Sequence, residues 1–368
     1  MGRRLHRLGD HAARSGRRVT ARNCYLRATT YLNQALFFAL ASSTPTWAHQ
    51  AAVYRETESC FAAAGAQFVP AFTRVAIPYG RRTLPGWLLT PPGPQVRRPT
   101  LILNNGSDAQ NIVMLISGGL AALERGWNGL IFEGSGQGSQ LFLHDIPFRP
   151  DWEKVITPIV SWLRTRPEVD RRRIMLLGSS FGGYLVPRAA SFEHRLAGVA
   201  VDPGAPNSFS TWSRDLPPQM LTWLQHGKRH EFNQYWAGAQ PFLSTNTRFY
   251  VAKRAQVFGR GSFYDQMRLA RRFDLPASLA RRIKAPTVIV QTALEQFYPG
   301  QSKQLYHWLH AKKSLISFTV AEGTGYHCEP TAPTVRNDAV LDWLEANLRK
   351  CPTFCVGMSR KETHVQHN

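Results

Sequence analysis

The 368-residue sequence is poor in cysteine, and its five cysteines form no recognisable pattern. They show neither the paired spacing of a metal site nor that of a disulfide framework, so we expect a reduced, cytoplasmic protein that holds no metal and no cofactor. No apolar run approaches the length of a membrane span, and the N-terminus lacks the hydrophobic stretch of a signal peptide. We therefore expect neither export nor membrane insertion. The cysteines are Cys24, Cys60, Cys328, Cys351 and Cys355.

Acidic residues are also scarce, at 24 against 45 lysines and arginines, and the net charge is +21. Such a charge attracts anions over long distances, so an acidic carrier protein or an acidic peptide is an expected partner. The densest basic cluster runs from Arg3 to Arg22, without the interleaved aromatic residues of a nucleic-acid surface. We expect no nucleic-acid binding. A small molecule or peptide is the expected substrate, and the composition is compatible with a homodimer.

Strands and helices alternate along the middle of the chain, which predicts a mostly parallel sheet with helices on both faces. Two alternating segments joined by Gly80-Arg81 predict an antiparallel hairpin at the start of that sheet. The predicted hairpin strands are 68–79 and 82–89, the next strands are 100–104, 128–133 and 173–177, and the helices between them are 110–125 and 152–165.

The chain divides into four predicted regions. Residues 1–66 form a helical N-terminal arm, because apolar side chains recur there at helical spacing. The α/β core comprises 67–205 and 283–350. Between these two parts lie about 80 residues, too many for a simple crossover, so 206–282 are predicted as a helical cap insertion. The tail at 351–368 is predicted to be disordered.

The segment from Ile174 to Tyr184 is a hydrophobic strand that leads through Gly-x-Ser-x-Gly into a helix. This is the context of a nucleophile elbow, in which a serine occupies a strained turn at the start of the helix. Gly178 and Gly182 supply the small neighbours that the turn requires. The sequence therefore predicts Ser180 as a nucleophile.

A serine hydroxyl needs a base, and His327 has the right position in the chain. The strand at 315–320 precedes it and a helix at 335–348 follows it, so His327 is expected at the same edge of the sheet as Ser180. Its neighbour Cys328 is expected to point elsewhere rather than to act as a second nucleophile.

The acid that orients the histidine should follow the preceding strand, 287–291. Glu295 is the one carboxylate in the loop after that strand, and we predict it as the third member of the triad. Asp202, at the end of an earlier strand, is the reserve candidate.

An oxyanion needs two backbone N–H donors. The first is predicted to be Phe181, directly after the nucleophile. The second is expected in the turn after strand 100–104, where Gly106 and Ser107 are the candidates. The cap is dense in aromatic residues, which can form its core or roof the serine with an apolar pocket. The pocket candidates are Trp212, Trp223, Tyr235 and Trp236.

With these residues assigned, the chain resembles the α/β-hydrolase superfamily. It is most similar to the branch that contains 2,6-dihydroxypseudooxynicotine hydrolase, the fungal polyketide-shortening hydrolases and the fermentation-respiration-switch-like esterases. The motifs that carry this resemblance are Ala21-Arg22-Asn23-Cys24-Tyr25-Leu26-Arg27-Ala28, Gly134-Ser135-Gly136-Gln137-Gly138, Gly178-Ser179-Ser180-Phe181-Gly182-Gly183, Phe297-Tyr298-Pro299-Gly300-Gln301 and Gly325-Tyr326-His327-Cys328.

The resemblance implies an eight-stranded α/β-hydrolase sheet, with the family's nucleophile on Ser180 and its histidine on His327. The family's acid, usually aspartate, falls on Glu295. The oxyanion loop departs from the family, because Asn104-Asn105 stand where members often carry glycine.

The activity that the resemblance implies is cleavage of a C–C, ester or thioester bond beside a carbonyl in a bulky aromatic or polyketide-like molecule, in secondary metabolism. Peptide-bond cleavage remains open, as does an acyl-transfer or ring-closing tailoring reaction. A hydrolase fold kept as a binding module without turnover is a third reading.

Overall fold

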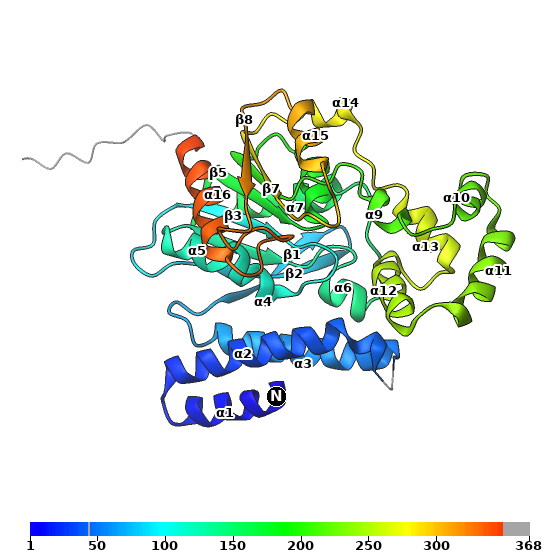
Figure 1. Ribbon diagram of the computed structural model, residues 1–368. Helices are drawn as coiled ribbons and strands as arrows, with labels where there is room; N and C mark the ends of the chain where they lie inside the picture. The colour runs from blue at the N-terminus through cyan, green and yellow to red at the C-terminus, as the bar shows by residue number, and fades with distance from the viewer. Residues whose placement is uncertain (43–44, 349–368) are drawn as a thin grey trace, which may run out of the picture.

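The structure, a computed structural model, describes residues 1–42 and 45–348 and contains one eight-stranded sheet between layers of helices (Figure 1). The strand order is β1-β2-β4-β3-β5-β6-β7-β8. β2 is antiparallel to β1 and β4, whereas all other neighbours are parallel, which confirms the predicted fold class. The strands are β1 Thr73–Tyr79, β2 Arg82–Leu89, β3 Arg98–Asn104, β4 Asn128–Phe132, β5 Val169–Ser179, β6 Gly198–Asp202, β7 Thr287–Thr292 and β8 Lys313–Phe318.

Both faces of the central strands are apolar because both are covered by helices. Leu101 and Leu103 of β3 belong to the core on one face, and the intervening Ile102 belongs to the core on the other. Burial of each such side chain stabilises the fold by about 1.5–3 kcal/mol. The helices of the α/β core are α4 Asn111–Met114, α5 Leu120–Glu124, α6 Gly138–Phe142, α7 Glu153–Leu163, α8 Gly182–Ala190, α14 Ala277–Ala280, α15 Gln301–Trp308 and α16 Pro333–Asn347.

The helix predicted at 110–125 is interrupted. A π-helical segment, Leu115–Gly119, separates α4 from α5, and Gly118 within it has φ +157°. A Cβ at Gly118 would lie 2.9 Å from Leu103 Cδ2, so the glycine lets this segment approach β3 closely. The sequence periodicity did not reveal this break.

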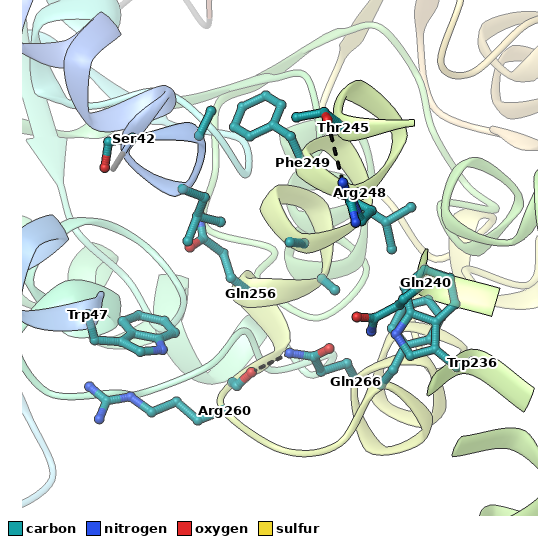
Figure 2. Close-up of a pocket in the computed structure, with 17 residues that line it drawn as sticks. Ser42, Trp47, Trp236, Gln240, Thr245, Arg248, Phe249, Gln256, Arg260 and Gln266 are labelled. Carbon is teal, nitrogen blue, oxygen red and sulfur yellow. Dashed lines mark hydrogen bonds between the residues drawn. The ribbon is translucent and has the colours of Figure 1, made fainter. Parts of the chain in front are cut away.

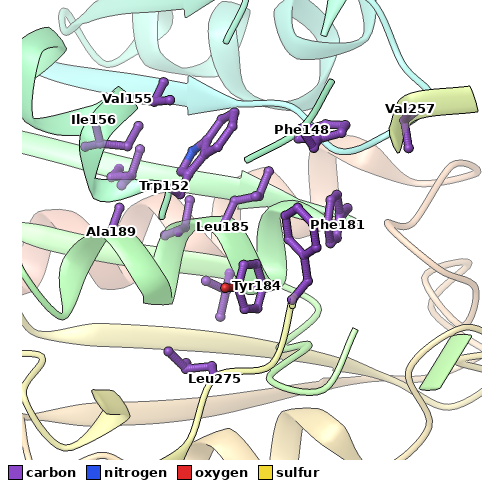
Figure 3. Close-up of a cluster of buried hydrophobic side chains, with 14 of the residues drawn as sticks. Phe148, Trp152, Val155, Ile156, Phe181, Tyr184, Leu185, Ala189, Val257 and Leu275 are labelled. Atoms are coloured by element: carbon purple, nitrogen blue, oxygen red, sulfur yellow. The ribbon is translucent and has the colours of Figure 1, made fainter. Parts of the chain in front are cut away.

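A buried apolar cluster supports the start of α8 (Figure 3). Trp152, which precedes α7, and Ile156 of α7 pack in the same cluster as Leu185 of α8. The Phe181 ring contacts Phe148 at a centroid distance of 5.1 Å. The residue after the predicted nucleophile is therefore held by packing on several sides.

The N-terminal region is helical, as predicted, and lies along one side of the core in Figure 1. Phe61 of α3 packs edge-to-face on Trp87 of β2, with ring centroids 5.6 Å apart. Tyr54 of α3 donates a hydrogen bond to Glu133, which follows β4 (2.7 Å). The elements are α1 Gly2–Arg14, α2 Arg18–Phe37, a short 3-10 turn Ala39–Ala41 and α3 Trp47–Gly65.

Between β6 and β7 the chain forms a group of helices, which we call the cap, at one end of the molecule (Figure 1). They fall within the range 206–282 predicted for an insertion. The tail predicted at 351–368 lies outside the described residues. The cap consists of α9 Phe209–Ser213, α10 Pro218–Gln225, α11 Arg229–Ala239, α12 Thr245–Ala255, α13 Phe263–Ala270 and two 3-10 turns, Gln240–Phe242 and Gln256–Phe258.

None of the helices in the described ranges combines the length and the apolar character that crossing a lipid bilayer requires.

Candidate active site

Ser180 occupies a sharp turn between β5 and α8 with φ +57°, a backbone conformation rare for serine. Its N–H donates to the carbonyl of Asp202 at the end of β6 (2.7 Å). The turn depends on glycine, because a Cβ at Gly178 would lie 2.6 Å from the carbonyl oxygen of Gly182. A Cβ at Gly183 would lie 1.9 Å from that of Pro203. Small residues thus let β5, α8 and the loop after β6 meet at Ser180.

The structure brings Ser180, His327 and Glu295 into one hydrogen-bonded chain. His327 Nε2 lies 2.9 Å from Ser180 Oγ, and His327 Nδ1 lies 2.9 Å from both carboxylate oxygens of Glu295. An ionised carboxylate can only accept, so Nδ1 carries the proton and donates to Glu295. Nε2 is then free to accept the proton of the serine hydroxyl.

Glu295 is held in its ionised form. Burial opposes ionisation, but hydrogen bonds from His327 and from two backbone N–H groups outweigh burial and keep the pKa of Glu295 below its ordinary value. The backbone donors are Phe297 (2.9 Å) and Tyr298 (3.1 Å), both to Oε1. The carboxylate is therefore suited to stabilising an imidazolium.

Asp202, the reserve candidate, does not take that position. Its carboxylate faces the fully buried Arg336 of α16, with Nε and Oδ2 3.6 Å apart. Glu329 lies 3.7 Å from the same guanidinium, and its pKa is raised to about 11 by burial and by the charge of Asp202. The guanidinium and the two carboxyl groups together join the end of β6 to the loop that carries His327.

Cys328 follows the histidine, and its thiol is hydrogen-bonded to the backbone. Its Sγ donates to the carbonyl of Asp202 (3.4 Å), and burial raises the pKa of the thiol well above its ordinary value. The side chain therefore remains a thiol and is not an activated nucleophile.

The predicted oxyanion donors lie close together, but they differ in whether their N–H groups already donate a hydrogen bond. A Cβ on Gly106 would come within 3.0 Å of Phe181 N, so the loop after β3 lies directly against the elbow. The Gly106 N–H donates to the side chain of Asn105 (2.7 Å). Within the described residues, the N–H groups of Phe181 and Ser107 have no hydrogen-bond partner. These two groups are available to a ligand.

The loop after β3 is held by a polar network that sequence reasoning missed. Asn104 accepts from Trp152 Nε1 (2.7 Å), and the carbonyl of Asn105 accepts from Gln137 Nε2 (2.7 Å). The side chains of Asn104, Trp152 and Gln137 are all buried. The sequence signal for this network was the pair Asn104-Asn105 in place of glycine. The hydrogen-bond partners of this pair lie on distant elements, so the spacing of residues along the chain could not identify them.

A cavity of about 350 Å³, the catalytic cavity, opens above Ser180 and His327. Its apolar lining comes mainly from α4 and the π-helical segment, the loop after β7 and the cap. Sequence reasoning did not identify Val113, Met114 or Ile116 as lining residues, because a helical pattern does not say which neighbour a face will meet. Other lining residues are Ser107, Asp108, Thr211, Trp212, Arg254, Phe297, Tyr298 and Pro333.

The predicted pocket aromatics are divided between places. Trp212 lines the catalytic cavity and also a neighbouring cavity of about 480 Å³, the cap cavity. Tyr235 and Trp236 line the cap cavity but not the catalytic cavity. Trp223 lines neither, and packs edge-to-face on Tyr235 with centroids 5.7 Å apart.

A third cavity, of about 720 Å³, is larger than these two and separate from the triad. It lies between Trp47 at the start of α3 and the cap residues Trp236, Phe249 and Gln266 (Figure 2). The hydrogen-bonded triad opens into the smaller catalytic cavity, so cavity volume does not identify the candidate active site. Across residues 1–42 and 45–348 no group of three or more histidine, cysteine or acidic side chains could hold a metal ion.

The model of the alpha/beta hydrolase family matches residues 112–343 of the chain, which include the elbow, the acid and the histidine. The chain belongs to the alpha/beta hydrolase family. The resemblance inferred from the motifs is thereby confirmed, and the protein is a hydrolase of this fold.

Among its relatives, this hydrolase is 28% identical to "Hydrolase acrC" of Aspergillus aculeatus over 92% of the chain and 84% of the relative. It is 26% identical to "20-hydroxy-prefusarin hydrolase FUS2" of Gibberella moniliformis over 92% of the chain and 84% of that protein. The solved structure of 2,6-dihydroxy-pseudo-oxynicotine hydrolase superposes with a TM-score of 0.65 at 18% identity. That match covers 94% of this chain and 86% of the other, and it supports the shared fold, including the N-terminal helices.

Proposed function

We propose that this protein is a serine hydrolase that cleaves an acyl bond of a bulky, largely apolar substrate through Ser180, His327 and Glu295. The observation that carries the proposal is the continuous chain of 2.9 Å contacts from Ser180 Oγ through the imidazole to Glu295. These contacts lie at the wall of a cavity large enough for part of a small-molecule substrate.

In this mechanism Ser180 Oγ attacks the substrate carbonyl while its proton passes to His327 Nε2. Glu295 stabilises the imidazolium that results. The oxyanion accepts hydrogen bonds from the N–H groups of Phe181 and Ser107, each worth about 3 kcal/mol of barrier. His327 then protonates the departing alcohol, thiol or carbanion, and the acyl group remains on Ser180 until water, activated by the same histidine, releases it as the acid.

The substrate class rests on the cavity and on the relatives. The catalytic and cap cavities are walled by aromatic and aliphatic side chains, which suits an aromatic or polyketide-like molecule of secondary metabolism. The name of the Gibberella relative describes a hydrolase of 20-hydroxy-prefusarin. The bond cleaved would be an ester, a thioester or a C–C bond beside a ketone.

A fluorophosphonate probe tests the nucleophile. Labelling of the wild-type protein should disappear in Ser180→Ala, and His327→Ala should lower turnover of an activated ester by about 10³-fold or more. Absence of labelling would indicate a binding module, and near-normal turnover in His327→Ala would contradict the relay.

A substrate panel of esters, thioesters, β-diketones and peptides, read by mass spectrometry, tests the bond type. Hydrolysis adds one water to the substrate, whereas transfer of the acyl group to a nucleophile within the same substrate closes a ring and adds none. The mass change thus separates hydrolysis from acyl transfer, and the class of compound that is cleaved separates peptide cleavage from cleavage of an ester, thioester or C–C bond.

A further inference from the structure

The catalytic cavity adjoins the cap cavity. Thr211, Trp212 and Arg254 line both of them, and their volumes are about 350 Å³ and 480 Å³. A substrate whose carbonyl lies at Ser180 can therefore extend past these three side chains into the cap. The shape favours an elongated molecule over a compact one.

Arg254, on α12, is the charged residue at this junction. It is half-buried, and its guanidinium lies over the ring of Phe297, 5.1 Å from the centroid. Phe297 in turn packs edge-to-face on the imidazole of His327, with centroids 4.6 Å apart. The cation is thus one aromatic ring away from the proposed catalytic base.

Asp108 and Glu295 already have partners, whereas no described carboxylate pairs with the Arg254 guanidinium. Asp108 of the catalytic cavity faces the buried Lys253 (3.4 Å), and Glu295 is bound to His327. Asp215 lines the cap cavity but is exposed and makes no ion pair with Arg254. Within the part of the chain that the structure describes, the guanidinium of Arg254 has neither a salt bridge nor a hydrogen bond.

A half-buried guanidinium with five N–H donors and no acceptor favours an anionic ligand group, because it binds carboxylate-like oxygens in a bidentate manner. The protein's net charge of +21 would also attract such a substrate.

We propose that Arg254 binds an acidic oxygen of the substrate, a carboxylate or an enolate, on the part of the molecule that extends from the scissile carbonyl toward the cap. The substrate class is then an elongated acyl compound that carries a second, negatively charged group. This inference rests on the proposed function, since it assumes that the carbonyl binds at Ser180.

The test uses pairs of alkyl fluorophosphonates that end either in a carboxylate or in its methyl ester, made in a series of chain lengths. The second-order rate constant for labelling Ser180 is measured for each. In the wild type the carboxylate probe of the best-fitting length should react about tenfold faster than its ester. In Arg254→Gln the ratio of the carboxylate rate to the ester rate should fall to about one, whatever the ester rate itself becomes, and Arg254→Lys should retain part of the preference.

Arg248→Gln is the matched control, because it removes a charge from the same helix at an exposed position that lines neither cavity. It should keep the preference of the wild type. Equal labelling by both probes at every chain length, or a preference that survives in Arg254→Gln, would overturn the role of Arg254 and leave the serine hydrolase intact. Failure of both probes to label Ser180 would overturn the proposed function itself.

Discussion

A glutamate that orients a histidine has one more rotatable bond than an aspartate and must be held at more points. Glu295 meets this need through the backbone N–H groups of Phe297 and Tyr298, both of which donate to Oε1. Phe297 also packs against the imidazole. The loop after β7 therefore positions the acid and the histidine together.

Removing the charge of Glu295 should impair chemistry rather than folding. Glu295→Gln keeps the shape but cannot fix the histidine tautomer, so we expect kcat to fall by about 10³ to 10⁴-fold. Asp202→Asn is the control, because Asp202 faces Arg336 and not the imidazole. It should lower the melting temperature and change kcat of the folded protein far less. The opposite ranking, measured by steady-state kinetics and thermal melts, would make Asp202 the acid.

Because Gly106 lies so close to the elbow, we expect its substitution by alanine to impair catalysis. In Gly106→Ala the new Cβ would lie 2.8 Å from Ser180 Cβ and 3.0 Å from Phe181 N, so the loop must move away from the oxyanion position. A displacement of about 1 Å should lower kcat by roughly 10²-fold.

Gly238→Ala is the control for this change, since a Cβ at Gly238 meets nothing within 4 Å and the residue lies in α11. Its kcat should equal that of the wild type. A normal kcat in Gly106→Ala would show that the loop after β3 does not position an oxyanion donor.

At the scale of elements, helix α3 is attached to the core through the half-buried Glu58 and the buried Glu133. Asn111 Nδ2 donates to Glu58 of α3 (2.7 Å) and to Glu133 after β4 (3.2 Å). Burial and the charge of Glu133 raise the pKa of Glu58 to about 8. Below that pH Glu58 stays protonated in the folded protein, so the two acids can share one amide without repulsion.

This pairing predicts how stability depends on pH. Because the pKa of Glu58 is higher in the folded protein than its ordinary 4.5, the folded state binds more protons between pH 4.5 and about 8. The free energy of unfolding should therefore fall as pH rises through this window.

Thermal melts across the same range provide the measurement. In Glu58→Gln the melting temperature should decline less with pH, by a few degrees over the window. Glu56→Gln is the control on the same helix, since Glu56 pairs with Arg3 on α1. Parallel profiles for the wild type and Glu58→Gln would contradict the assignment.

At the scale of the whole molecule, the charge of +21 should accelerate the capture of anions. We expect the labelling rate of the carboxylate fluorophosphonate to fall by roughly threefold or more between low and high salt, while that of the ester probe stays nearly constant. The same salt series, applied with an acidic carrier protein as acyl donor, tests the expected acidic partner. If the labelling rate of the carboxylate probe does not change with salt, the positive net charge does not accelerate the capture of anionic substrates.

A structural feature could be predicted from the sequence where the residues that form it are neighbours in the chain. The elbow at Ser180 was predictable because a strand, small residues and a helix succeed one another directly, and the turn follows from their backbone preferences. The alternation of strands and helices fixed the fold class for the same reason. The break at Gly118 was not predictable, since the residue that Gly118 approaches, Leu103 of β3, lies in a different element of the chain.

The amino-acid sequence by itself determined the fold class, the helical arm, and the order serine, acid, histidine along the chain. Only the tertiary structure decided that Glu295 rather than Asp202 contacts His327, because the choice depends on Arg336 from a helix far away in the chain. Tertiary contacts also decided that Arg254 faces the cavity while Trp223 does not. Such choices follow from packing between distant elements, and no local pattern of residues records them.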